Sequence, residues 1–235
     1  MTDGVVVLTG AGISAESGLK TFRAADGLWE NHRIEEVATP EGFARAPETV
    51  HAFYNERRRQ LADVNPNRAH VALAAFEREW RGDFMLITQN IDDLHERGGS
   101  GKVLHMHGEL LKMRCEHCGG VFVIRDDLSM ESVCADCHEA GGLRPDIVWF
   151  GEMPYYMEEI TMALSRCTMF VSIGTSGNVY PAAGFVRQAR AAGAECVELN
   201  LEPSAGGDCF DRKFYGPATE VVGDFFSHLS PTISA

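Results

Sequence analysis

The sequence has no apolar run of about 18 residues, the length that a membrane-spanning helix needs. Its first residues, Met1 to Gly4, lack the basic start and the long apolar stretch of a secretory signal peptide. No internal repeat or low-complexity tract is visible. We therefore expect neither a membrane protein nor a secreted one, and we place the chain in the cytoplasm.

Basic residues are scarce: 21 Lys and Arg stand against 34 Asp and Glu, a formal net charge of −13. An acidic surface repels phosphate backbones, so nucleic acid is excluded as the main partner and basic protein segments are better matched. Apolar residues make up 45% of the 235 positions, which is ordinary globular usage and enough for a buried core.

Short apolar runs of about five residues predict strands that are buried on both faces, as in a parallel sheet. They are Val5 to Thr9, Phe84 to Thr88, Met169 to Ile173 and Cys196 to Asn200. Helical stretches lie between them, including Asn67 to Trp80 and Pro181 to Ala192. This alternation predicts an α/β fold with a Rossmann-type parallel sheet.

Two segments differ from this strand–helix alternation in their residue pattern. Residues 33–81 read as helices without a strand candidate, and residues 115–143 carry cysteines and turns with few large apolar residues. We expect them to form an inserted small domain, made of a helical module (33–81) and a zinc-ribbon module (115–143). The Rossmann-type domain then comprises residues 1–32, 82–114 and 144–235.

A glycine-rich loop follows the first predicted strand directly. The segment from Gly10 to Ala15 reads Gly-Ala-Gly-Ile-Ser-Ala and matches the dinucleotide-binding fingerprint. Gly10 would permit a tight turn, Gly12 would let the backbone approach a pyrophosphate, and Ala15 would let the following helix pack near the strand. A plain glycine turn is the alternative. The acidic residue that usually follows about 20 positions later is missing, and Asn200 to Glu202 is a candidate replacement.

Every conspicuous polar motif follows a predicted strand at its carboxyl end, where open α/β sheets bind their ligands. These motifs are Gly10 to Gly12, Gln89 to Asp92, Gly174 to Ser176 and Asn200 to Glu202. Each one alone is also explained as a helix N-cap, because Asn, Asp, Ser and Thr favour that position. Together they predict one shared crevice.

The cysteines include two closely spaced pairs. Cys115-x-x-Cys118 is followed, after fifteen residues, by Cys134-x-x-Cys137. This spacing predicts a zinc ribbon in which four thiolates hold one tetrahedral zinc ion. We expect the zinc to be structural, since no coordination position stays open for a substrate. Disulfide bonds are the alternative, which a reducing compartment disfavours.

Histidines near the predicted crevice are candidates for a general base, because imidazole titrates near neutral pH. His105 and His107 lie two residues apart and would share a face of an extended segment. His95 competes with them. Position alone does not choose among the three.

The motifs that carry a family resemblance are Gly10 to Gly18, Thr21 to Arg23, Thr88 to Asp92, His107 to Glu109, the four cysteines, Val148 to Glu152, Gly174 to Ser176 and Asn200 to Glu202. In this order they resemble the sirtuin family, in particular its bacterial class III (CobB-like) deacylases, over nearly the whole chain. Lys20 departs from the family pattern, since proline is common at that position.

The resemblance implies an NAD-dependent protein lysine deacylase that acts on acylated-lysine proteins, with NAD as a consumed co-substrate and one structural Zn²⁺. The acyl oxygen would attack C1′ of the nicotinamide ribose, and the products would be nicotinamide, free lysine and O-acyl-ADP-ribose. The implied catalytic residues are His107, as the base, and Asn90. The implied NAD-binding residues are Gly10, Ala11, Gly12, Ala15, Phe22, Arg23, Gln89, Asn90, Ile91, Asp92, Gly174, Thr175, Ser176, Asn200, Leu201, Glu202 and Ala218. The implied peptide-binding residues are Val148, Phe150, Gly151 and Glu152, which would pair with the substrate as a strand.

The acyl group is suggested by Tyr54 and Arg57, which share a helix face and resemble the Tyr-x-x-Arg pair of desuccinylating and demalonylating sirtuins. Arginine offers a planar fork of donors that fits a terminal carboxylate. A solvated basic face is the alternative, because Arg58 and Arg59 follow.

Two other functions stay open at this stage. The same motifs suit a protein ADP-ribosyltransferase, in which another nucleophile captures the ribosyl group, or a non-catalytic NAD sensor. The sequence does not define the oligomeric state, for which we expect a monomer.

Overall fold

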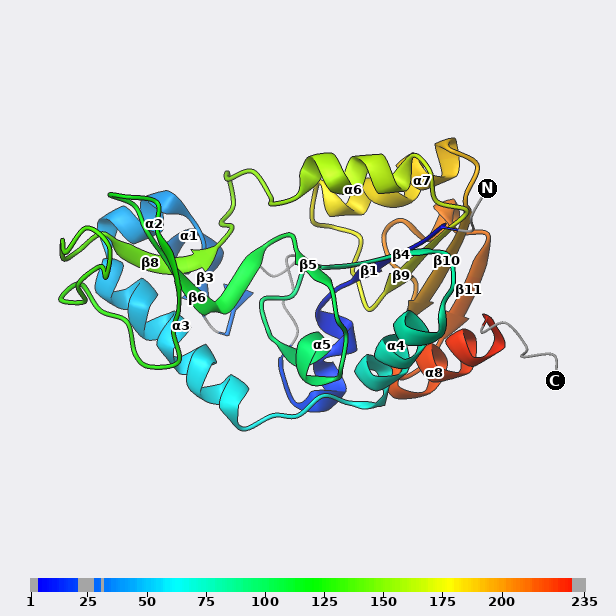
Figure 1. The fold of residues 1–235 in the computed structure, drawn as a ribbon, viewed down its shortest axis with the longest axis horizontal. Coiled ribbons are helices and arrows are strands. Elements are labelled where there is room, and N and C mark those ends of the chain that lie inside the picture. Colours follow the sequence, from blue (N-terminus) through cyan, green and yellow to red (C-terminus); the bar gives the residue numbers. More distant parts are fainter. Residues whose placement is uncertain (1–3, 21–27, 31, 230–235) are drawn as a thin grey trace.

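The computed structural model describes residues 4–20, 28–30 and 32–229 (Figure 1). A parallel six-stranded sheet has the order β11-β10-β9-β1-β4-β5. Its strands are β1 (Gly4–Thr9), β4 (Asp83–Thr88), β5 (Val103–His105), β9 (Met169–Ile173), β10 (Glu195–Asn200) and β11 (Arg212–Tyr215). Read from β5, this is the strand order of the doubly wound Rossmann fold. The predicted fold class is confirmed, and the apolar runs are strands.

Helices cover both faces of this sheet (Figure 1). They are α4 (Arg68–Glu79), α6 (Met157–Leu164), α7 (Phe185–Ala191) and α8 (Ala218–Leu229). Val6 and Leu8 of β1 pack in the cluster beneath α6 and α7, whereas Val5 and Val7 pack in the cluster beneath α4 and α8. Burial on both faces explains why the strands read as unbroken apolar runs. Among the described residues, no helix combines the length and apolar character needed to cross a membrane.

A small domain occupies the other end of the molecule (Figure 1). Its elements are β2 (Leu28–Trp29), β3 (His32–Arg33), α1 (Ile34–Val37), α2 (Pro40–Arg45), α3 (Pro47–Ala62), β6 (Gly108–Cys115), β7 (Val121–Val123) and β8 (Leu143–Ile147). The last three strands form an antiparallel sheet in the order β7-β6-β8. Phe53 and Tyr54 of α3 share a core with Leu110, Ile147 and Trp149, so the helices and the sheet are packed together.

Helix α4, which the sequence pattern places in the module 33–81, packs on the Rossmann sheet. Its residues Ala69, Leu73 and Phe76 belong to the same buried cluster as β1 and α8. Asn67 caps this helix, because its side-chain oxygen accepts a hydrogen bond from the Ala69 N–H at 2.9 Å. The domain boundaries remain a proposal, and these contacts favour ending the helical module before Asn67.

Two segments expected to be helices, the one after the glycine loop and Pro181 to Ala192, contain short 3₁₀ turns. The 3₁₀ elements of the fold are η1 (Ala11–Ile13), η2 (Ala15–Ser17), η4 (Ala182–Gly184) and η5 (Gly207–Cys209), and α5 (Leu94–Arg97) is a single α-helical turn. In the described residues as far as Lys20, no α-helix follows the glycine loop, and η1 and η2 stand there instead. Ala15 is exposed, so the expectation that it allows a helix to pack near the strand is wrong.

The glycine loop packs against a second loop that follows β9. Gly12 N–H donates a hydrogen bond to Gly174 O at 2.8 Å, and Gly10 N–H donates to Ile173 O at 2.9 Å. A Cβ atom on Gly12 would lie 2.6 Å from Gly174 Cα. Gly174 itself has a φ of +61°, a value that favours glycine. The two loops therefore approach backbone to backbone, which no larger residue at position 12 permits.

The four paired cysteines converge at one end of the β6–β7–β8 sheet. Their sulfur atoms all lie within 4.8 Å of one another. The Sγ atoms of Cys115 and Cys137 are 3.7 Å apart, and those of Cys118 and Cys134 are 3.6 Å apart. A tetrahedral zinc site with Zn–S bonds of about 2.3 Å has sulfur separations of about 3.8 Å. These distances fit zinc and are too long for disulfide bonds, so the cysteines are positioned to bind a zinc ion.

Two buried side chains of α3 attach the zinc ribbon to the helical module. The Asn55 amide donates to Leu128 O and accepts from Leu128 N–H, both at 2.9 Å, as a neighbouring strand would. Arg58 donates to Leu110 O at 3.1 Å and to Asp126 O at 3.0 Å. These bonds make the ribbon and the helices one small domain.

We predict that Gly12→Ala lowers the free energy of unfolding by about 2–4 kcal/mol, because the added methyl group forces the two loops apart. Gly223→Ala is the matched control: an added Cβ there meets nothing within 4 Å, and alanine favours the helix interior by up to about 1 kcal/mol. Urea unfolding without ligand measures both. Equal midpoints for Gly12→Ala and the wild type would contradict the prediction.

We predict one zinc ion per chain, lost in Cys134→Ala together with several kcal/mol of unfolding free energy, because structural zinc stabilises segments too small for a core of their own. Metal analysis and thermal unfolding test this. Cys209→Ala, outside the cluster, should keep the zinc. A purified wild type that binds no metal and in which all four cluster thiols react with a thiol reagent would refute the prediction.

Candidate active site

A cavity of about 850 Å³ opens at the carboxyl ends of β1, β4, β9 and β10. It spans the point between β1 and β9 where the strand order reverses, the usual ligand-binding position of this fold. All four polar loops line it, and it extends to Tyr54 and Arg57 in the small domain. The predicted crevice thus continues between the two domains.

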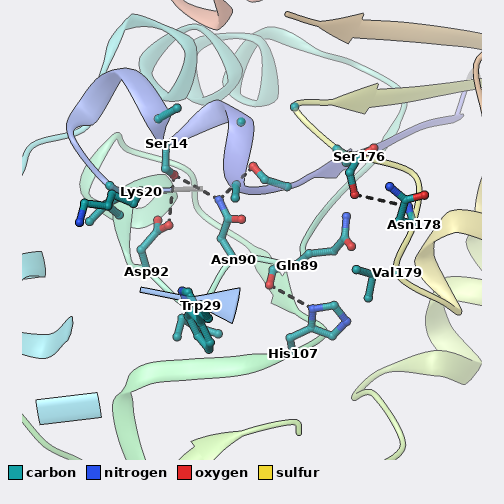
Figure 2. A pocket seen from close by; sticks show the side chains of 18 of the residues that line it. Ser14, Lys20, Trp29, Gln89, Asn90, Asp92, His107, Ser176, Asn178 and Val179 are labelled. Carbon is teal, nitrogen blue, oxygen red and sulfur yellow. Dashed lines mark hydrogen bonds between the residues drawn. The ribbon is translucent and has the colours of Figure 1, made fainter. Parts of the chain in front are cut away.

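Ser14 connects the glycine loop to two polar residues after β4 (Figure 2). Asn90 Nδ2 donates to Ser14 Oγ at 3.1 Å and to Gly10 O at 3.2 Å, and Ser14 Oγ donates to Asp92 Oδ2 at 3.1 Å. Both N–H bonds of the Asn90 amide are used inside the protein, which leaves its oxygen for a ligand. The sequence pattern missed Ser14, because its hydroxyl was read only as part of a glycine motif.

Asp92 is a buried carboxyl group with a shifted pKa. Burial raises its pKa to about 6, although hydrogen bonds from Leu94 N–H and Ser14 oppose the shift. Behind Ser14 lies His70, whose pKa is lowered to about 4 by burial. Its Nδ1 accepts from Asn67 N–H at 3.2 Å, so the neutral ring presents Nε2–H to Ser14 Oγ at 3.4 Å. The site therefore pairs a neutral imidazole with a carboxyl group that titrates near pH 6.

Of the three candidate histidines, His107 is the one that lines the cavity. Its Nδ1 lies 3.1 Å from Gln89 O (Figure 2). A carbonyl oxygen only accepts hydrogen bonds, so the proton is on Nδ1 and the lone pair on Nε2. Burial lowers the pKa of His107 against the opposing effect of the Gln89 hydrogen bond. His107 is consequently neutral near pH 7 and able to accept a proton.

The other two candidates, His105 and His95, are buried and contact side chains of the protein interior. His105 contacts Glu96 Oε1 at 2.7 Å and Asn90 O at 3.2 Å. Burial opposes protonation of His105, but the hydrogen bond and charge of Glu96 raise its pKa. His95 is fully buried, contacts Thr9 Oγ1 at 2.9 Å, and has a pKa far below its ordinary value because of burial. Neither is available as the base of a reaction in the cavity.

The residues implied for the adenosine half of NAD all line the same cavity, namely Gly174, Thr175, Ser176, Asn200, Leu201, Glu202 and Ala218. Asn200 Nδ2 donates to Thr175 O at 2.8 Å and thereby ties the loop after β10 to the loop after β9. Gln89, Ile91 and Ala11 line the cavity as well. Phe22 and Arg23 lie outside the described residues.

Tyr54 and Arg57 form the part of the cavity that α3 contributes. Tyr54 is fully buried and its hydroxyl accepts from Trp149 Nε1 at 2.9 Å. Arg57 is 8% exposed, donates to Phe53 O at 2.7 Å, and stacks over the Phe53 ring at 3.7 Å. The solvated basic face considered for this segment is therefore wrong for Arg57. Its Nε atom is buried and bonds no described residue, while its Nη1 also donates to Glu56 Oε2 at 3.2 Å.

The segment from Val148 to Glu152 lines the cavity beside His107. The Val148 N–H donates to His107 O at 2.9 Å, and the Phe150 N–H donates to Ala38 O at 2.9 Å. Gly151 has a φ of +93°. The Glu152 carboxylate binds Arg144 at 2.8 Å and so braces this segment from within the chain.

Comparison with known proteins agrees with this architecture. The model of the Sir2 family matches residues 10–181. The NAD-dependent protein deacylase of Escherichia coli (strain K12) is 58% identical over 233 residues, which cover 98% of this chain and 84% of that protein. A Sir2 homologue solved as an NAD complex has a TM-score of 0.88 and 38% identity, covering 97% of this chain and 90% of its own. A Sir2 protein bound to acetylated peptide has a TM-score of 0.83 and 30% identity, covering 97% and 93%.

These likenesses extend over nearly the whole chain. On fold, strand order and sequence identity, the chain belongs to the Sir2 family.

Proposed function

We propose that this chain is an NAD-dependent protein lysine deacylase that removes acetyl groups and also acidic acyl groups such as succinyl and malonyl. The proposal depends mainly on one observation: His107, the Asn90 amide and the glycine loop line one cavity, and this cavity continues to Arg57. The names of the E. coli relative and of the NAD and acetylated-peptide complexes support the proposal.

The residues present suit NAD. The glycine loop and the loop at Gly174 pack together and both line the cavity where the strand order reverses, the usual position of a dinucleotide in this fold. Asn90 and Asp92 would hold the nicotinamide carboxamide and the adjacent ribose, and the residues after β9 and β10 the adenosine half. When bound, NAD supplies the ribose C1′ to which the acyl oxygen is transferred as nicotinamide leaves.

His107 would serve as the general base. Gln89 O holds its Nδ1–H at 3.1 Å, which orients the ring and directs the lone pair of Nε2 into the cavity. The lowered pKa keeps the imidazole neutral, so it can take a proton from the ribose hydroxyls. Asn90, fixed by Ser14 and Gly10, would contribute an amide oxygen that needs no reorganisation.

Tyr54 and Arg57 would select the acyl group. The buried guanidinium of Arg57 has an unused Nε–H, and a terminal carboxylate satisfies such a donor with a charge-assisted hydrogen bond. The peptide around the lysine would lie along Val148 to Glu152. Because the N–H groups of Val148 and Phe150 are already bonded, a peptide strand would pair with carbonyl oxygens and with Gly151.

We expect NAD-dependent loss of the acyl mass from acetyl-lysine and succinyl-lysine peptides, with release of nicotinamide, and we expect His107→Tyr to abolish both. Since the neutral form of His107 is active and burial lowers its pKa, and since Asp92 in the same site has a pKa of about 6, kcat/KM should stay level near neutral pH and fall as the pH drops below about 6. Mass spectrometry across pH 5–8 measures both effects.

His117→Tyr, on the zinc ribbon, is the control and should retain activity. Transfer of label from NAD to unmodified protein, without acyl loss, would instead indicate an ADP-ribosyltransferase. Binding of NAD without any turnover would indicate a sensor.

We expect Arg57→Met to reduce desuccinylation about tenfold to a hundredfold, the value of one charge-assisted contact, and to reduce deacetylation much less. Arg59→Met is the matched control on the same helix, because Arg59 pairs with Asp127 at the surface. Steady-state kinetics with both peptides gives the ratio. Equal losses on both substrates would remove Arg57 from the acyl pocket.

A further inference from the structure

Glu30 introduces a second carboxylate into the acyl end of the cavity. Its Oε2 lies 2.8 Å from Lys20 Nζ and 3.9 Å from Arg57 Nη2. The side chains of Glu30 and Arg57 are 10% and 9% exposed, whereas that of Lys20 is 75% exposed. All three residues line the cavity. Lys20 appears in Figure 2 on the same side of the pocket as Asp92.

The backbone at Glu30 is held in an uncommon conformation. Its φ is +50°, in the left-handed region that residues with a side chain rarely occupy. The adjacent Trp29 fixes this position, because its ring packs edge-on against Phe53 at 5.0 Å and against Tyr54 at 6.0 Å. A rare backbone state maintained by packing is a common feature of functional sites.

Glu30 is close to Arg57 but does not satisfy it. At 3.9 Å the two groups attract each other without a hydrogen bond. The Nε–H of Arg57 still lacks a partner among the described residues. The guanidinium thus has two counter-charges: Glu56, which accepts a hydrogen bond from Arg57 Nη1 at 3.2 Å, and Glu30, which unlike Glu56 lines the cavity where the acyl chain would lie.

We propose that Glu30 is a specificity-determining residue that sets the balance between neutral and acidic acyl groups. It neutralises Arg57 when the acyl chain is uncharged, and it repels the terminal carboxylate of an acidic chain bound to the same guanidinium. Lys20 limits this repulsion by holding the Glu30 carboxylate at 2.8 Å. This inference rests on the proposed function and names three charges, rather than one, as the determinant of acyl preference.

The size of the effect follows from Coulomb's law. Two carboxylates that share one guanidinium lie about 5 Å apart, where like-charge repulsion corresponds to roughly fourfold weaker binding in water and roughly two-hundredfold at an effective dielectric constant of about 20. Because the site is partly exposed and Lys20 screens Glu30, we expect a change of about tenfold. The repulsion acts only on a charged acyl chain. It therefore changes the ratio of the two activities, which a general structural defect does not.

The experiment compares kcat/KM for succinyl-lysine and acetyl-lysine peptides in Glu30→Gln, Glu30→Asp and Lys20→Met. Glu30→Gln keeps an oxygen for Lys20 and removes the charge, so the succinyl-to-acetyl ratio should rise about tenfold, mainly through KM for the succinyl peptide. Glu30→Asp restores the charge and should return the ratio towards the wild type. Lys20→Met should lower the ratio. Glu35→Gln, a surface carboxylate that pairs with Arg33, is the control of equal net charge.

A second readout does not depend on turnover. Calorimetric titration of succinyl-lysine peptide without NAD should show tighter binding to Glu30→Gln than to the wild type, with the difference reduced at high salt. An unchanged or lower succinyl-to-acetyl ratio in a folded Glu30→Gln overturns the inference and leaves the deacylase proposal intact. A wild type that processes neither peptide overturns the proposed function, and the binding series then still tests whether Glu30 repels an acidic acyl group.

Discussion

The backbone contact between Gly12 and Gly174 is the constraint on which the rest of the structure depends. Each loop follows a strand on one side of the reversal in strand order, and each lacks the Cβ atom that would keep the other away. The Gly12 hydrogen bond to Gly174 O closes the cavity floor at this point. Gly10 O and Ser14 are thereby placed to hold the Asn90 amide. A tight backbone junction thus positions the polar groups, and no long helix is needed after the loop.

Burial then assigns each polar group in the cavity its protonation state. Removal from water disfavours charge, which lowers the pKa of His107 and His70 and raises that of Asp92. His105, with Glu96 as its partner, shows the opposite shift. Burial therefore produces a neutral base at the cavity wall, whereas the Glu96 carboxylate overcomes the same effect at His105 and forms an ion pair behind that wall. Local partners, rather than histidine itself, decide which ring is reactive.

In the proposed function, the small domain would supply the selectivity that the Rossmann sheet lacks. Tyr54 and Arg57 of helix α3 line the cavity. Asn55 and Arg58 of the same helix bond the zinc ribbon and so attach the helix to it. The four cysteines are positioned to bind zinc in a segment with few large apolar residues. A zinc ion held there would lie outside the cavity and would still support the geometry of the proposed acyl pocket. Lys20, Glu30 and Arg57 place three charges at that end of the cavity.

The sequence by itself determined the strands, the fold class, the cysteine cluster and the polar loops at one sheet edge, because these depend on local periodicity, on spacing and on where strands end. Tertiary structure decided the rest: which histidine faces the cavity, that η1 and η2 replace a helix, that Ala15 is exposed, and that α4 joins the sheet. The reason is physical. Solvent exposure and polar partners, such as the Gln89 carbonyl for His107 or the Glu30 charge for Arg57, come from residues distant in the chain, and no local pattern encodes them.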